Sequence, residues 1–335
     1  MFSITTEERR RRLGVRHHLA RSAPSVVPVA GDLVGIHSSD PSTVFLSARA
    51  RVTSFEPADL EAALYEERSL VRVLGMRRTL FVVPLEMEVL LRAGFAKRYE
   101  PAERRRLEGW LAEQHDLAPD WLDDVVTRTL AALEKLGEAS ARELTGEVPE
   151  LATKLTVGAG TKWGGQVGLS TRVLFFLAAA GRIIRVRPLG SWVSGQYRWA
   201  ALEAWLDQQP RHLDLRMARA KAIGRWLASY GPGTFDDVKW WAGIGVRDTR
   251  VALADAGAVE VELDGTTGFV APGDTGTTDP PEPWAALLPS LDSTPMGWKV
   301  RRWFLGEHEK QLFDRNGNIG PTIWVNGRVI GGWAQ

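Results

Sequence analysis

The chain has 335 residues, of which 44% are hydrophobic and 25% charged, and its formal net charge is +1. This composition is ordinary for a globular protein, and the length predicts two or three domains. The absence of cysteine excludes disulfides and thiolate chemistry and favours a reducing cytosol. Because no stretch is apolar enough for a membrane span or a leader, we expect a soluble cytoplasmic protein.

Charge is distributed unevenly along the chain. Residues 111–150 hold ten acids and three bases, whereas residues 151–230 hold twelve Lys or Arg and three acids. Arginine supplies 34 of the 42 basic residues. A basic face attracts polyanions, and arginine suits bidentate contacts with phosphates and base edges. A GC-rich genome explains the arginine preference equally well, but it does not explain the segregation of charge.

The first third of the chain predicts helices followed by a two-stranded hairpin. Helical spacing covers residues 6–21, 41–52 and 56–67, and strands are expected over residues 69–75 and 77–84. We expect the arginine-rich first helix to present either a solvated basic face or a phosphate contact.

The segment "GDLVGIHSSDPSTVFLSARARV" places His37, Ser39 and Asp40 directly before a helix. An imidazole can accept a proton from water near neutral pH, Ser39 can orient that water, and Asp40 can hold the imidazole or stabilise positive charge. Two other interpretations stay open. Asp40 and Pro41 can be the N-cap and first residue of the helix, with His37 a neutral hydrogen-bonded residue. His37 can also contact a DNA phosphate at the helix N-terminus.

The middle of the chain repeats the same order of elements. Helices are predicted over residues 121–137, 140–146 and 170–181, and a hairpin over residues 182–200. The glycine-rich segment 156–170 does not match a phosphate-binding loop, and we expect it to bridge two helices.

The third repeat has the clearest signals. Three helices are predicted within residues 213–257, the second of them opened by the capping sequence "TFDD". Residues 258–271 then alternate across an Asp-Gly turn, which is a strong hairpin signal. A turn-rich linker follows at 271–283, and the tail predicts a second hairpin that turns at Asn326-Gly327.

Helices followed by a hairpin is the order of a winged helix-turn-helix. We therefore predict an α+β protein of three tandem winged-helix modules with a β-rich C-terminal part. The expected boundaries are 1–110, including the N-terminal basic helix, 111–205, 206–270, and 271–335 for the linker and the β-rich segment.

Such modules bind duplex DNA, with the third helix in the major groove and the hairpin on the minor groove or the backbone. Trp192 at the tip of the second hairpin can pack on a neighbouring domain or insert between bases. The residues predicted to contact DNA are Arg49, Arg51, Arg77, Arg78, Arg172, Arg182, Arg185, Arg187, Trp192 and Arg198.

Five blocks in order along the chain resemble the winged-helix DNA glycosylase family, whose members remove alkylated purines and unhook interstrand crosslinks and include the azinomycin self-resistance glycosylase. The blocks are "GIHSSDPSTVFLSARARV", "LVRVLGMRRTLFVVP", "SYGPGTFDDVKWWAGI", "ALLPSLDS" and "GPTIWVNGRVIGGW". The resemblance implies three tandem winged helices around duplex DNA.

The family carries a Gln-x-Gln or Gln-x-Asp motif just before the Asp-Pro start of a helix, and here His37 and Ser39 occupy those positions. Phe81 stands where a histidine is common. The resemblance therefore implies DNA binding more directly than it implies catalysis.

We predict a DNA repair glycosylase that hydrolyses the N-glycosidic bond of alkylated, bulky or crosslinked purines in duplex DNA. His37, Ser39 and Asp40 are its expected catalytic residues. The alternative is a DNA-binding protein without catalysis, either a regulator or a lesion binder, and a protein-interaction scaffold is a third possibility. We expect no cofactor, no metal and no membrane partner, a monomeric state, and association with the bacterial nucleoid.

Overall fold

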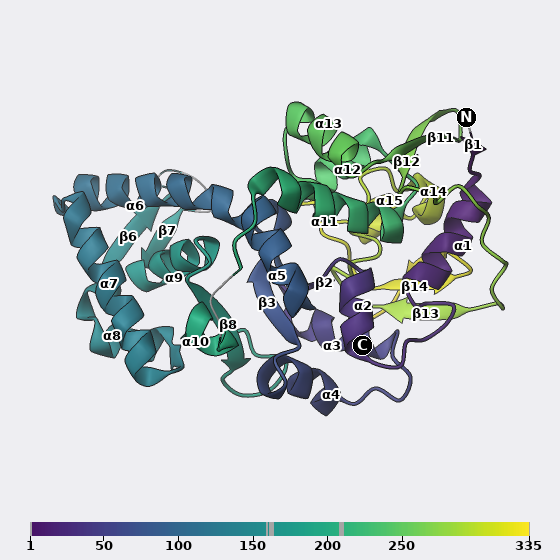
Figure 1. The fold of residues 1–335 in the computed structure, drawn as a ribbon. Coiled ribbons are helices and arrows are strands. Elements are labelled where there is room, and N and C mark those ends of the chain that lie inside the picture. Colours follow the sequence, from purple (N-terminus) through teal and green to yellow (C-terminus); the bar gives the residue numbers. More distant parts are fainter. Residues whose placement is uncertain (1, 159, 161–163, 208–210, 335) are drawn as a thin grey trace. The chain divides into compact units, whose positions relative to one another are not determined.

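The computed structural model describes the whole chain except residues 1, 159, 161–163, 208–210 and 335. It divides into two compact units. The first unit combines residues 1–94 with residues 213–335, and the second comprises residues 95–212 (Figure 1). The first unit is therefore discontinuous in sequence, because the chain leaves it near residue 94 and returns near residue 213.

The N-terminal part of the first unit contains a three-stranded antiparallel sheet. The short strand β2 pairs with the second hairpin strand, so the order across the sheet is β2-β4-β3. The elements are α1 (Thr6–Arg16), α2 (Val26–Asp32), β2 (Ile36–His37), α3 (Pro41–Arg49), α4 (Pro57–Glu61), η1 (Ala62–Glu66), β3 (Leu70–Leu74), η2 (Met76–Arg78), β4 (Leu80–Pro84) and α5 (Leu85–Leu91).

After the chain returns to the first unit, the same topology recurs with the order β1-β11-β12-β10. The N-terminal strand β1 (Phe2–Ser3) adds to it by pairing in parallel with β11. The elements are α11 (Leu215–Tyr230), β10 (Gly233–Thr234), α12 (Phe235–Ala242), α13 (Val246–Asp255), β11 (Val259–Leu263) and β12 (Thr266–Val270).

A third sheet, of order β13-β14-β15, closes the first unit. It accounts for the predicted β-rich tail. Its strands and the two short helices between them are β13 (Ala285–Leu288), α14 (Arg302–Leu305), α15 (Glu309–Leu312), β14 (Thr322–Val325) and β15 (Arg328–Gly332).

The second unit repeats the topology once more, with the order β5-β9-β8. Here a second hairpin, β6–β7, lies between the second and third helices of the repeat. The chain enters through η3 (Arg92–Ala96) and η4 (Lys97–Tyr99). The elements are α6 (Glu100–His115), α7 (Pro119–Leu136), β5 (Ala139–Ser140), α8 (Ala141–Glu147), η5 (Pro149–Ala152), β6 (Lys154–Val157), β7 (Gly165–Gly168), α9 (Leu169–Ala179), β8 (Ile183–Pro188), β9 (Tyr197–Ala201) and α10 (Leu202–Leu206).

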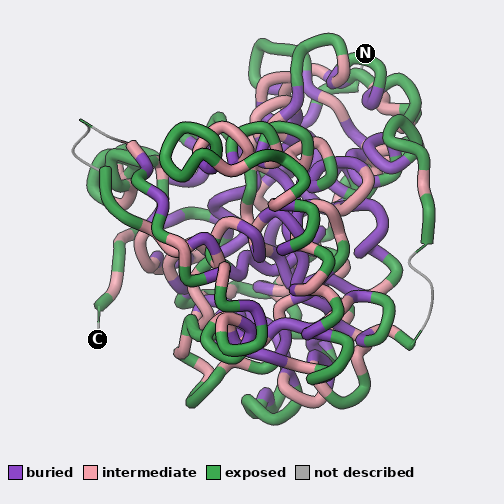
Figure 2. Tube along the Cα trace, turned by 90° about the vertical axis from the view of Figure 1, so that its left-hand side faces the viewer, coloured by how far each residue is buried: buried purple, intermediate pink, exposed green. Residues whose placement is uncertain are grey.

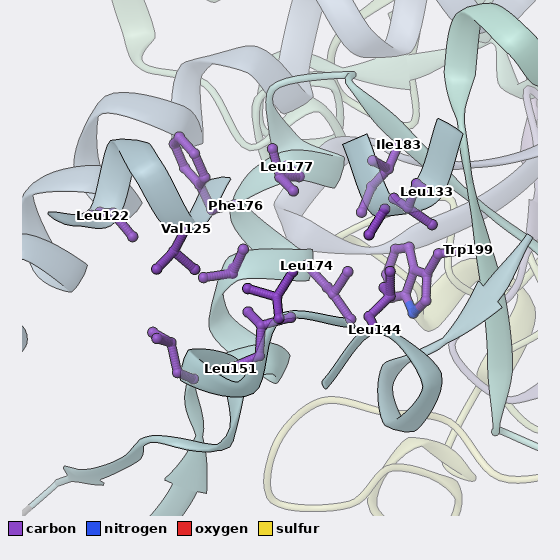
Figure 3. Packing of buried hydrophobic residues seen from close by; sticks show 14 of the residues in the cluster. Leu122, Val125, Leu133, Leu144, Leu151, Leu174, Phe176, Leu177, Ile183 and Trp199 are labelled. Atoms are coloured by element: carbon purple, nitrogen blue, oxygen red, sulfur yellow. The ribbon is translucent and has the colours of Figure 1, made fainter. Parts of the chain in front are cut away.

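Apolar side chains from α7, α8, α9 and the β8–β9 hairpin form one buried cluster in the second unit (Figure 3). Leu122, Leu144, Leu174 and Trp199 belong to it, each at most 8% exposed. Buried and exposed positions alternate along the chain in these elements (Figure 2). Because residues of α9 and of the β8–β9 hairpin share this core, the two elements lie side by side.

Local signals explain where many elements begin and turn. Thr234 caps α12, with Asp237 Oδ2 accepting a hydrogen bond from the Thr234 backbone N–H, which confirms the predicted capping box. The Asp264-Gly265 and Asn326-Gly327 turns have positive φ at both residues, as two-residue hairpins require. Both predicted hairpins are therefore confirmed.

Several features differ from the sequence prediction. Helices α2, α5 and α6 were not predicted. The segment 156–170 contributes strands to the β6–β7 hairpin instead of only bridging two helices. Residues 159 and 161–163 of that segment lie outside the described residues.

The arginine-rich helix α1 does not present a solvated basic face at every position. Arg9 and Arg12 are only 4% and 1% exposed. Arg12 pairs with Glu8 and Asp274, and the Arg9 guanidinium lies 4.1 Å from the centroid of the Trp303 ring. Burial and these partners remove both residues from any phosphate contact.

Among the helices within the described ranges, none combines the length and apolar character needed to cross a bilayer.

Candidate active site

Asp40 occupies the N-cap of α3, and Pro41 is the first helical residue. Asp40 Oδ1 accepts hydrogen bonds from the Ser42 backbone N–H at 2.8 Å and from Ser42 Oγ at 2.7 Å. The helix-cap interpretation of Asp40 is therefore confirmed. Its second carboxylate oxygen, Oδ2, makes no hydrogen bond to a described residue.

His37 ends strand β2, opposite Phe81 of β4. The residue is 5% exposed, and its ring meets Phe81 edge to face with the centroids 5.8 Å apart. Burial, followed by the positive charge of Arg77, lowers the pKa of His37 to about 4, although Asp292 and Asp40 oppose the shift. The imidazole is therefore neutral near pH 7 and a weaker base than a solvent-exposed histidine.

The two serines that follow His37 lie in different environments. Ser38 is buried, and its Oγ accepts a hydrogen bond from Arg72 Nε at 2.8 Å. Ser39 is exposed, and its backbone N–H points to His37 Nδ1 at 3.5 Å, the outer limit of a hydrogen bond. Nδ1, the accepting nitrogen in this geometry, thus faces the turn that carries Ser39.

A segment from the C-terminal part of the chain holds the strand that carries His37. Ser293 Oγ accepts a hydrogen bond from the His37 backbone N–H and donates one to the Gly35 carbonyl, both at 2.9 Å. This contact joins residues 256 positions apart, and sequence reasoning missed it. The only available signal was a serine within the family-like block "ALLPSLDS".

Asp292, the residue before Ser293, forms an ion pair with Arg51, and both side chains are fully buried. The guanidinium donates to both carboxylate oxygens, at 2.7 and 2.9 Å, and Ser47 Oγ donates to the same carboxylate at 2.6 Å. Although burial opposes ionisation, the charge of Arg51 and these hydrogen bonds lower the pKa of Asp292. The prediction that Arg51 contacts DNA is wrong, because its side chain is sealed inside the first unit.

The other predicted DNA contacts of the first unit lie at or near its surface. Arg49 and Arg78 are exposed, and Arg77 is half-buried. Arg77 and Arg78 both adopt positive φ within η2. The Arg77 guanidinium lies 3.8 Å from the centroid of the Trp240 ring, a cation–π geometry. Trp240 is thus a partner that the sequence did not indicate.

The predicted contacts of the second unit cluster on α9 and the β8–β9 hairpin. Arg182 and Arg187 are exposed, and Trp192 is half-buried in the connection between the strands. Arg198 pairs with Glu138, donating to its backbone carbonyl at 2.7 Å. The guanidinium groups of Arg172 and Arg185 lie 5.3 and 5.0 Å from the centroids of the Trp110 and Trp199 rings, respectively.

Comparison with known proteins places this chain in a family. The model of the family described as DNA glycosylase AlkZ-like matches residues 30–335. A search among curated protein sequences finds no match. Among solved structures, the Streptomyces sahachiroi DNA glycosylase AlkZ superposes with a TM-score of 0.75 at 19% identity, covering 99% of this chain and 88% of that one. Because the family model spans most of the chain, the protein belongs to the AlkZ-like DNA glycosylase family.

Proposed function

We propose that this protein is a DNA repair glycosylase that hydrolyses the N-glycosidic bond of alkylated purines, including bulky or crosslinked ones, in duplex DNA. The observation that carries the proposal is the neutral imidazole of His37 facing the turn of the exposed Ser39, directly ahead of α3. Family membership supports the reaction class.

We also propose that the three repeated topologies are winged helix-turn-helix modules. In each, a short strand between the first and second helices pairs with the second strand of the following hairpin, as in β5-β9-β8. We propose that the modules span residues 1–110, 111–205 and 206–270, with residues 271–335 as the linker and β-rich segment. Residues 95–110 nevertheless pack with the second unit. In such modules the third helix and the hairpin contact DNA.

In the proposed reaction, a water attacks C1′ of the deoxyribose while the bond from C1′ to the purine nitrogen breaks. The purine leaves with the bonding electrons, and an N7-alkylated purine that was cationic leaves neutral. His37 Nδ1 exchanges its long 3.5 Å contact with the Ser39 backbone N–H for the attacking water and accepts the proton of that water, and Ser39 orients it. Asp40 keeps its Oδ2 available to stabilise the positive charge that develops on the sugar, although Oδ1 caps the helix.

The proposed partner is double-stranded DNA, bound by a monomer. The residues proposed to contact it are Arg49, Arg77 and Arg78 in the first unit, and Arg172, Arg182, Arg185, Arg187, Trp192 and Arg198 in the second. The excess of positive charge over residues 151–230 supports this interface.

A DNA-binding protein without catalysis is the second candidate, and specific observations favour it. His37 is 95% buried with a pKa of about 4, and the residue across from it, Phe81, is apolar. These features reduce the basicity that the proposed reaction needs.

The test is incubation with duplex DNA containing 7-methylguanine, followed by alkali and electrophoresis. Strand breaks in the wild type that His37→Ala abolishes support the glycosylase. Tight, salt-sensitive binding without strand breaks supports the second candidate instead. Circular dichroism of His37→Ala separates loss of chemistry from loss of folding.

A further inference from the structure

The second unit contains a pocket of about 530 Å³ that lies apart from the proposed catalytic residues. Two of its lining residues, Arg172 and Arg185, are also among the proposed DNA contacts. It lies between the start of α8, the outer face of α9 and the β8–β9 hairpin, all of which belong to one unit. Its volume falls within the range of small-molecule binding sites. Leu174 and Trp199 of its lining also belong to the apolar cluster shown in Figure 3.

Three arginines line this pocket. They are Arg142 at the start of α8, Arg172 on α9 and Arg185 on β8, and no carboxylate appears among the described lining residues. Guanidinium groups are always charged near pH 7, so their mutual repulsion favours binding of an anion between them. Arg142 and Arg172 form no ion pair with any described residue, and the buried Nε of Arg172 has no hydrogen-bond partner.

The nearest acid in sequence is already engaged elsewhere. Glu143 follows Arg142, and its carboxylate accepts a hydrogen bond from the Ser140 backbone N–H at 2.7 Å as part of a capping box. That hydrogen bond and the one with the Ser140 hydroxyl lower the pKa of Glu143. The carboxylate therefore stays at the end of α8 and does not neutralise the arginines.

Aromatic rings supply the other part of the lining. Phe175, Tyr197 and Trp199 contribute to the wall, and the guanidinium of Arg185 lies 5.4 and 5.0 Å from the Tyr197 and Trp199 ring centroids. Aromatic walls favour a planar ring, because offset stacking adds to the burial of apolar surface. A guanidinium that faces such a ring can also pair with a carboxylate through two parallel N–H groups.

We propose that this pocket binds a small aromatic carboxylate, with its ring among the aromatic side chains and its carboxylate on Arg142 and Arg172. The ligand is a free small molecule, and its binding does not depend on glycosylase activity. A neutral aromatic ring has no charge to pair with the arginines, and an aliphatic anion has no ring to stack on the aromatic side chains.

Isothermal titration of the full-length protein with 2-naphthoate tests the proposal, with 2-naphthol and octanoate as comparison ligands. We expect 2-naphthoate to bind at least ten times more tightly than either. Arg142→Gln and Arg172→Gln should each weaken 2-naphthoate binding by about tenfold or more. Arg105→Gln, an exposed arginine of the same unit outside the pocket, is the matched control and should bind 2-naphthoate as the wild type does.

Equal affinity for 2-naphthoate and 2-naphthol, or unchanged binding in both pocket variants, would overturn the proposal. Binding of a 5′-phosphorylated thymidine dinucleotide without binding of 2-naphthoate would also overturn it, and would assign the pocket to DNA. Thermal unfolding of each variant verifies that a loss of binding is not a loss of structure.

Discussion

The imidazole of His37 and the ring of Phe81 are paired across β2 and β4 and meet edge to face at an angle of 72°. These are two of the positions where the chain departs from the motif of the family it resembles. There, a glutamine occupies the first position and a histidine is common at the second. In this protein the imidazole therefore lies on β2, and the opposite position on β4 holds an apolar ring.

If the protein is a glycosylase, restoring the two glutamines of the family motif just before α3 should preserve its activity. We expect the double variant His37→Gln, Ser39→Gln to cleave 7-methylguanine from duplex DNA within about tenfold of the wild-type rate, whereas His37→Ala falls by about a hundredfold or more. Quantifying abasic sites in single-turnover reactions provides the comparison. A double variant as inactive as His37→Ala would show that amide side chains cannot act in this environment.

Separating the Arg51–Asp292 pair should be costly for folding. Asp292→Asn or Arg51→Met leaves one buried partner uncompensated, so each should lower the free energy of unfolding by about 3–5 kcal/mol. Urea denaturation measures this change. The exposed pair Arg216–Asp255 provides the control, because Arg216→Gln should leave the free energy of unfolding nearly unchanged. Similar losses at both pairs would contradict the structural role given to Asp292.

Acid should destabilise the protein through two buried histidines. Burial lowers the pKa of His17 to about 3 and that of His37 to about 4, both from 6.5. Below pH 6.5 the unfolded chain takes up protons at these residues while the folded chain does not, so stability falls as the pH decreases towards 4. Each residue adds a slope of about 1.4 kcal/mol per pH unit within this window.

This slope is measured by urea denaturation at pH 7, 6 and 5. His37→Gln removes one of the two groups and should flatten the dependence by the slope of one proton. A pH dependence that is the same in wild type and variant would mean that His37 titrates normally in the folded state.

The exposed arginines of the β8–β9 hairpin should contribute to DNA binding mainly through charge. If Arg182 and Arg187 each contact a phosphate, the double variant to Gln should reduce the slope of log K against log salt by about 1.8. Fluorescence anisotropy with a labelled duplex across several salt concentrations gives the slope. The control variant Arg105→Gln should leave this slope unchanged. A double variant with the wild-type slope would show that the hairpin is not part of the DNA interface.

Short-range features of this fold could be predicted from the sequence. The helix cap at Asp40, the capping box at Thr234 and the Asp-Gly and Asn-Gly hairpins each depend on residues within a few positions of one another. Their hydrogen bonds and backbone angles form locally, so the amino acids alone indicate them. The α+β class and the three repeats of helices and hairpin followed from these local signals.

Only the tertiary structure decided what surrounds each candidate residue. The sequence predicted Arg51 as a surface arginine and left open whether His37 is a catalytic base or a neutral hydrogen-bonded residue, because nothing near them in the chain indicates burial. The partners that bury them, Asp292 and Ser293, lie more than 240 positions away. Burial and charge pairing arise from contacts between distant segments, and they determine which arginines can reach a ligand and which histidine stays neutral.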